Sequence, residues 1–224
     1  MMYFKKINLL FLLIFLGSLC HAQTDINPDK NFHLYILMGQ SNMAGRGEVE
    51  GELKTLKHNR VYMLDKNGEW QTAINPIHFD KPSAVGVGPG LSFGIDMAKT
   101  DSAIRIGLIP CAVGGTSIQK WQVGAYDKAT NTYPYDDAVL RIKNAMKYGV
   151  VKGVIWHQGE SNSSVINGES YLSQLDDLIS RVRKLTGDAK LPVVVGELGQ
   201  YKEQYQNFNK VLAKVPSKYD IQVW

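Results

Sequence analysis

Three short motifs in this sequence place polar side chains beside glycines. The first spans residues 39–45 and contains Ser41, the second spans 114–117, and the third spans 157–161. A serine hydroxyl can attack a carbonyl carbon, and N–H groups held by tight glycine turns or by a side-chain amide can stabilise the oxyanion that forms. If the fold brings them together, the three motifs predict a site for acyl transfer.

Ser41 is the candidate nucleophile. Gly39 and Gly45 flank it and allow a tight turn that would expose the hydroxyl and free the backbone N–H of Ser41. The alternative is an ordinary helix N-cap, which is a common position for serine. Met43 stands where a Gly-x-Ser-x-Gly elbow needs its second glycine, which disfavours an α/β-hydrolase fold.

The second and third motifs supply candidate oxyanion donors. Gly114 and Gly115 could present a backbone N–H to a substrate oxygen, or could form a turn that requires positive φ. Gln158 offers an uncharged amide donor, with a hydrogen-bonded loop residue as the alternative. His157 and Glu160 are possible supporting residues, but they lack the second histidine of a zinc-protease helix, so we expect no metal.

Buried strands that alternate with amphipathic helices must position these motifs. Apolar runs predict strands at 32–38, 61–64, 104–110, 153–157 and 192–198, and three- and four-residue spacing predicts helices at 91–99, 136–148, 171–185 and 204–214. Residues 220–224 resemble a further strand. The βαβα order predicts a three-layer α/β/α sandwich around a parallel sheet, with the three motifs at the carboxyl ends of its strands.

Composition points to one globular domain without a nucleic-acid partner. The 224 residues are 44% hydrophobic and 21% charged, with a net charge of +4. Without Lys5 and Lys6, 23 basic residues face 21 acidic ones, which leaves +2. A near-neutral chain without a long basic run is not typical of a nucleic-acid-binding protein.

Residues 1–22 read as a signal peptide, with the basic pair, an apolar run and a small-residue cleavage site before Gln23. A retained membrane anchor is the alternative, although the apolar run is short for a membrane span. We expect a secreted or periplasmic protein of 202 residues without a membrane span. Cys111 would be its single cysteine, so it could form no internal disulfide.

The motifs taken together resemble those of the sialate O-acetylesterase domain family, a carbohydrate esterase group that includes acetylxylan esterases and belongs to the SGNH hydrolases. The similarity covers residues 32 to about 198 and rests on Gly39–Gly45, Gly114–Ile118 with Trp121, and Trp156–Ser161. A segment from Val87 to Gly94 resembles the part that separates the first two blocks. The resemblance implies a flavodoxin-like fold, no cofactor, and acetylated carbohydrates such as xylan or sialic acid as substrates.

The resemblance also implies roles. Ser41 would be the nucleophile, and its N–H, the Gly114–Gly115 turn and Gln158 would form the oxyanion hole. The family's Asp-x-x-His motif, which supplies the general base, has no counterpart in this sequence. We therefore interpret residues 23–224 as an esterase domain truncated at its carboxyl end and inactive or slow as given. A glycan-binding protein that has lost the base is the second hypothesis, and His157 or Glu160 as a substitute base is the third.

Aromatic residues near the predicted sheet edge admit two interpretations. They could stack on sugar rings, or they could pack within the core, as aromatic residues at a sheet edge more often do. They are Trp121, Tyr133, Tyr135 and Trp156.

Overall fold

The structure is a computed structural model that describes residues 27–164, 168–218 and 222–223. Its strands are β1 (Asp29–Gly39), β2 (Val61–Leu64), β3 (Trp70–Thr72), β4 (Arg105–Pro110), β5 (Gly149–His157), β6 (Val193–Val195) and β7 (Gln222–Val223). Its helices are α1 (Ser41–Ala44), α2 (Pro89–Thr100), α3 (Pro134–Ala145), α4 (Gly168–Thr186), α5 (Glu203–Leu212) and α6 (Val215–Lys218). The short 3-10 helices are η1 (Gly51–Lys54) and η2 (Ile118–Trp121).

The strands form one sheet in the order β3-β2-β4-β1-β5-β6-β7, in which only β3 is antiparallel to its neighbour. The five strands from β4 to β7 have the flavodoxin order 2-1-3-4-5, and β2 and β3 extend the sheet beyond β4. The predicted α/β fold with a central parallel sheet is confirmed. In this order the chain reverses direction across the sheet between β1 and β5, and ligands bind beyond the strand ends at such a point.

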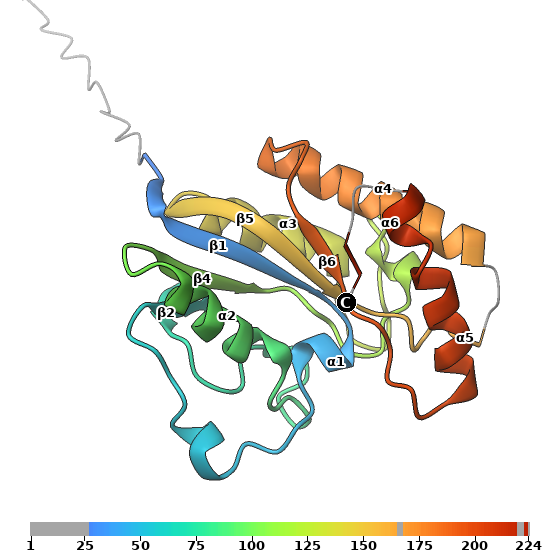
Figure 1. Cartoon of the computed structure of the whole chain (residues 1–224), viewed down its shortest axis with the longest axis horizontal. Coiled ribbons are helices and arrows are strands. Elements are labelled where there is room, and N and C mark those ends of the chain that lie inside the picture. The colour runs from blue at the N-terminus through green and yellow to red at the C-terminus, as the bar shows by residue number, and fades with distance from the viewer. Residues whose placement is uncertain (1–26, 165–167, 219–221, 224) are drawn as a thin grey trace, which may run out of the picture.

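Helices cover both faces of the sheet (Figure 1). Along β1, Leu34, Ile36 and Met38 face a core built with α3, α4 and α5, whereas Tyr35 and Leu37 face a second core built with α1 and α2. Because both faces are buried, β1 reads as a continuous apolar run, which is why its sequence predicted a strand in a parallel sheet.

Most elements lie where the sequence predicted them, with different ends. The predicted strand at 192–198 shortens to Val193–Val195, and the one at 153–157 begins at Gly149. The sequence did not predict β3, because Trp70–Thr72 is three residues long and half exposed and therefore has no apolar run. Of the predicted strand at 220–224, the structure describes the two residues of β7, which pair with β6.

The predicted signal peptide lies outside the described residues. Among the helices within residues 27–164 and 168–218, none is long and apolar enough to cross a membrane.

Candidate active site

The first motif makes an abrupt turn at the end of β1. Gly39 has φ +131°, and a Cβ built on it would lie 2.1 Å from the carbonyl oxygen of His157, so this close approach of β1 to β5 requires glycine. The Gln40 N–H donates to the same carbonyl at 3.0 Å. Ser41 follows as the first residue of α1.

Ser41 does not act as a helix cap. The N-cap position belongs to Gln40, which makes no side-chain cap hydrogen bond. Ser41 is half buried, and within the described residues neither its hydroxyl nor its N–H has a hydrogen-bond partner. Both groups are therefore free to meet a ligand at the carboxyl edge of the sheet.

The second motif is a turn fixed by a buried carboxylate. The Gly114 N–H donates to Asp80 Oδ2 at 2.7 Å, and the same oxygen accepts from Arg46 Nη2 at 2.8 Å. A Cβ on Gly114 would lie 2.1 Å from Arg46 Nη2, so a side chain there would displace the ion pair. Gly115, with φ +86°, has no partner for its N–H among the described residues. Of the two glycines, Gly115 therefore has the N–H that remains available.

Gln158 joins the three motifs. Its side chain is fully buried, and its amide N–H group faces Gln40 Oε1 at 3.1 Å, the Thr116 carbonyl at 3.2 Å and Asn162 Oδ1 at 2.7 Å. Both amide hydrogens thus have acceptors inside the protein. In this arrangement Gln158 positions the motifs, and direct donation from it to an oxyanion stays a prediction.

Two further contacts link the motifs. Glu160 accepts a hydrogen bond from Asn42 Nδ2, which ties the third motif to the first. The Ser161 hydroxyl donates to the Gly115 carbonyl at 3.2 Å, which ties it to the second. The structure thus brings all three predicted motifs to one edge of the sheet.

His157 is anchored to the neighbouring strand. Its Nε2 lies 3.0 Å from the Glu197 carbonyl, and because a carbonyl only accepts, Nε2 carries the hydrogen. The ring also packs against Gly196, where a Cβ would lie 2.4 Å from it. Nδ1 is buried without a hydrogen-bond partner, and no hydrogen bond among the described residues joins His157 to Ser41.

Sequence reasoning missed Arg46 and Asp80. Asp80 lies in the loop between β3 and α2, far along the chain from both glycine motifs, and no spacing rule connects it to them. The side chain of Asp80 is 2% exposed, which identifies it as a structural anchor of the Gly114 turn. A sequence signal existed only for Arg46, which directly follows the first motif.

The aromatic residues near this edge divide into two groups. Trp121 and Trp156 are fully buried and form an edge-to-face pair with ring centroids 5.2 Å apart, and Tyr135 is also buried. Tyr133 is exposed. The two tryptophans and Tyr135 therefore pack in the core, and only Tyr133 of the four is accessible for stacking on a sugar.

Comparisons with known proteins agree with one another. The family model described as carbohydrate esterase, sialic acid-specific acetylesterase, matches residues 31–223. A probable carbohydrate esterase of Arabidopsis thaliana, At4g34215, is 34% identical over 196 residues, which cover 77% of this chain and 70% of that protein.

Solved structures show the same fold. The X-ray structure of At4g34215 superposes with a TM-score of 0.74 at 27% identity, over 88% of this chain and 85% of that one. NanS superposes with a TM-score of 0.65 over 87% of this chain and 77% of its own. A carbohydrate acetylesterase from Xanthomonas citri, XAC1771, gives 0.63 over 85% and 49%. The last two are 18% identical to this chain.

Proposed function

This chain belongs to the carbohydrate esterase family of sialic acid-specific acetylesterases, and from that premise we propose that it removes O-acetyl groups from carbohydrates through an acyl-enzyme on Ser41. The observation that carries the proposal is the Ser41 hydroxyl at the end of β1, which has no partner among the described residues and whose motif is linked by hydrogen bonds to the motif of Gly115. The similarity to a probable carbohydrate esterase and to the structure of a carbohydrate acetylesterase supports the substrate class.

The proposed reaction has two steps. The Ser41 oxygen bonds to the acetyl carbon, the sugar oxygen leaves with a proton, and water then cleaves the acetyl-serine ester to release acetate. The N–H groups of Ser41 and Gly115 stabilise the oxyanion formed in each step. Gln158 holds the first and second motifs in register while this happens.

A general base must take the serine proton, and this sequence contains no Asp-x-x-His motif. Among the described histidines, His157 stands in one of the three motifs, but its unprotonated Nδ1 is buried and no hydrogen bond among the described residues joins it to Ser41. We therefore expect slow acetate release by the 224-residue chain, because a serine hydroxyl without a base is a weak nucleophile.

External imidazole tests this mechanism. Acetate release from acetylated xylan and from O-acetylated sialic acid would be measured for the full chain and for Ser41→Ala, with and without added imidazole. We expect imidazole to accelerate the wild-type chain well above the Ser41→Ala level, because it replaces the missing base. Equal rates for the two proteins under every condition would refute Ser41 as the nucleophile.

His157→Ala tests the alternative that His157 is the general base. If the wild-type chain is fast without imidazole and His157→Ala falls to the Ser41→Ala level, His157 is the base and our assignment is wrong. If neither the wild-type chain nor His157→Ala releases acetate under any condition but both bind acetylated glycans, the chain is a glycan-binding protein.

We also propose that the chain is exported, because residues 1–22 have the pattern of a signal peptide. Amino-terminal sequencing of the exported protein should begin at or near Gln23. An intact Met1 would contradict this.

A further inference from the structure

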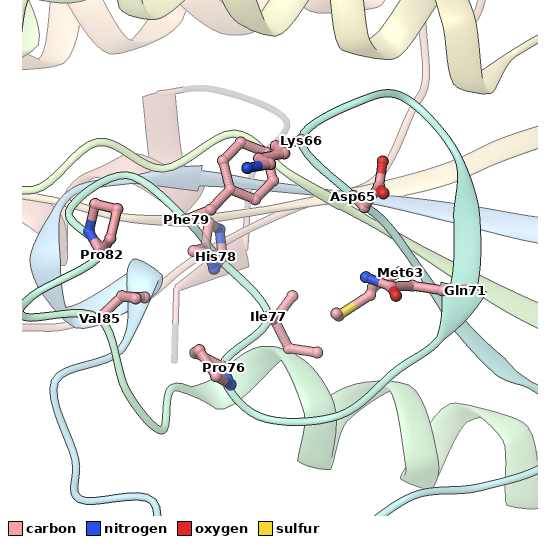
Figure 2. Close-up of a pocket in the computed structure, with 10 residues that line it drawn as sticks. All are labelled: Met63, Asp65, Lys66, Gln71, Pro76, Ile77, His78, Phe79, Pro82 and Val85. Atoms are coloured by element: carbon pink, nitrogen blue, oxygen red, sulfur yellow. The ribbon is translucent and has the colours of Figure 1, made fainter.

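A concave site lies at the carboxyl end of β2, a cavity of about 380 Å³ (Figure 2). Its walls come from the β2–β3 hairpin on one side and from the loop of residues 76–85 on the other. This volume falls within the range of small-ligand sites. The role proposed above for Ser41 does not use this cavity.

The floor of the cavity is apolar and includes an aromatic ring. Met63, Ile77 and Val85 line it together with Phe79. Phe79 also borders a smaller cavity that contains Arg141, whose guanidinium lies 4.7 Å from the ring centroid. Arg141 thus contacts one face of the ring, and Phe79 also lines the larger cavity.

Three polar side chains surround this floor. Gln71 reaches from β3 toward Met63, and Asp65 and Lys66 lie at the end of β2 (Figure 2). Asp65 Oδ1 accepts two backbone N–H groups of the hairpin turn, which leaves Oδ2 available. The side chains of Gln71 and Lys66 have no hydrogen-bond partner among the described residues. The rim therefore offers both donors and acceptors.

The charges of this lining favour a neutral ligand. The carboxylate of Asp65 and the ammonium of Lys66 cancel, and Gln71 is uncharged. Burial lowers the pKa of His78, which also lines the cavity, to about 4, so its ring is neutral near pH 7. A ligand with a net charge would find no excess of opposite charge here.

The cavity is connected to the candidate active site through consecutive residues. Phe79 lines the cavity, and the next residue, Asp80, accepts the Gly114 N–H. Val85 also lines it, and Gly86, which follows, donates its N–H to the Gly45 carbonyl just beyond α1. In the sheet only β4 separates β2 from β1, which places the two strands about 10 Å apart.

We propose that this cavity is a subsite for a neutral pyranose ring that neighbours the acetylated sugar, so that the protein acts on acetylated oligosaccharides of uncharged sugars. The apolar face of a pyranose, which consists of C–H groups, would lie on Phe79 and Ile77. Its hydroxyl groups would bond to Asp65, Lys66 and Gln71. The spacing of about 10 Å between β2 and β1 is of the order of one or two sugar rings, so a ring next to the acetylated sugar would reach the cavity. The assignment of this ring to an acetylated substrate rests on the proposed function.

The first test compares substrate lengths. The ratio of kcat/KM for acetylated xylotetraose to that for an acetylated monosaccharide would be measured, with imidazole present if the chain requires it. In Gln71→Ala and in Phe79→Leu we expect this ratio to fall about three- to tenfold through a higher KM, because ground-state binding is lost. Gln71 is exposed, so its replacement should leave the fold intact.

Each of the two variants has a control of similar chemistry outside the cavity. Thr72 follows Gln71 on β3 and points to the opposite face of the strand, and Tyr148 is an exposed ring at the amino end of β5. Thr72→Ala and Tyr148→Leu should leave the ratio unchanged. An unchanged ratio in both Gln71→Ala and Phe79→Leu would overturn the proposal.

The second test needs no catalysis. The full chain would be titrated with unacetylated xylotetraose and with N-acetylneuraminic acid, and binding would be followed by calorimetry. We expect xylotetraose to bind more tightly, and its Kd to rise about three- to tenfold in the two variants. Absence of xylotetraose binding, tighter binding of N-acetylneuraminic acid, or an unchanged Kd in both variants would each overturn the subsite.

The two proposals fail differently. If Ser41 proves not to be the nucleophile, acetate release does not depend on it, while xylotetraose still binds and still depends on Gln71 and Phe79. If the subsite is wrong, Ser41-dependent release persists and binding does not respond to either variant.

Discussion

At the scale of single residues, the Ser41 hydroxyl and the Gly115 N–H have no partner among the described residues, whereas polar groups around them are hydrogen-bonded. Asp80 accepts a hydrogen bond from the Gly114 N–H, and the side-chain amide of Gln158 donates to acceptors inside the protein. The turns that carry Ser41 and Gly115 are thus held in place by Asp80 and Gln158, whose polar groups bond inside the protein. Burial explains why some groups are bonded and others are not. A buried donor without an acceptor costs free energy, whereas a donor at the open edge of the sheet can bond to water or to a ligand.

Asp80 should therefore be a positioning residue. Asp80→Asn weakens the bonds to Arg46 and Gly114, so the turn that carries the Gly115 N–H loosens. We expect kcat for Ser41-dependent acetate release to fall about tenfold, less than the loss of a direct oxyanion donor, with little change in KM. Faster exchange of the Gly114 amide proton, measured by NMR, should accompany this fall.

Asp96 provides the control for that substitution. It forms an exposed ion pair with Lys99 on α2, and such pairs contribute little to stability. Asp96→Asn should change neither kcat nor the amide exchange of Gly114. A KM increase in Asp80→Asn without a change in kcat would show that Asp80 serves substrate binding instead.

At the scale of elements, the site depends on how closely β1 and β5 approach each other. Gly39 and His157 are paired in the register of the two strands, and the first motif turns at this pair. Any side chain on Gly39 would push the strand ends apart just where Ser41 and Gln158 leave them.

Gly39→Ala should accordingly be strongly destabilising. Its Cβ would collide with the His157 carbonyl, and the φ of +131° is unfavourable for alanine, so we expect a loss of at least about 3 kcal/mol in the free energy of unfolding. Urea denaturation measures this. Gly124→Ala is the comparison, because Gly124 has φ +70° but open space around it and should lose only about 1–2 kcal/mol. Equal losses would mean that the close approach carries no cost.

The sequence was a good guide to the elements and a weaker one to their contacts. Strands buried on both faces, such as β1 and β4, are recognised in the sequence as apolar runs. The three motifs lie at or just after the ends of strands of this kind. The half-exposed β3 has no such pattern. Contacts such as Asp80 to Gly114 join residues 34 positions apart through side-chain packing, which no local pattern encodes. No local pattern encodes the cavity between the β2–β3 hairpin and the loop of residues 76–85 either.

At the scale of the whole molecule, His78 links stability to pH. Burial lowers its pKa from 6.5 to about 4, with smaller opposing effects from the Leu37 carbonyl and Asp80. Between these values the unfolded chain binds a proton that the folded chain does not, so the free energy of unfolding falls as the pH drops from about 6.5 to about 4. The contribution is at most about 3 kcal/mol.

Urea denaturation at several pH values tests this dependence. The wild-type chain should lose stability steadily from pH 6.5 to pH 4, and His78→Gln should show a flatter profile over that window. Above about pH 7 the two profiles should run parallel. An equally steep acid loss in His78→Gln would assign the effect to other groups, among them His33, whose pKa burial also lowers.

Cys111 is a natural probe of how often the end of β4 opens to solvent. The thiol is fully buried at the end of β4, three residues before Gly114, and burial raises its pKa to about 12. An alkylating reagent reacts with the thiolate, so it can modify Cys111 only when this strand end opens to solvent. The rate of alkylation under native conditions therefore reports how often the strand that carries the Gly114–Gly115 turn comes apart, and it does so without any substituted residue or attached label.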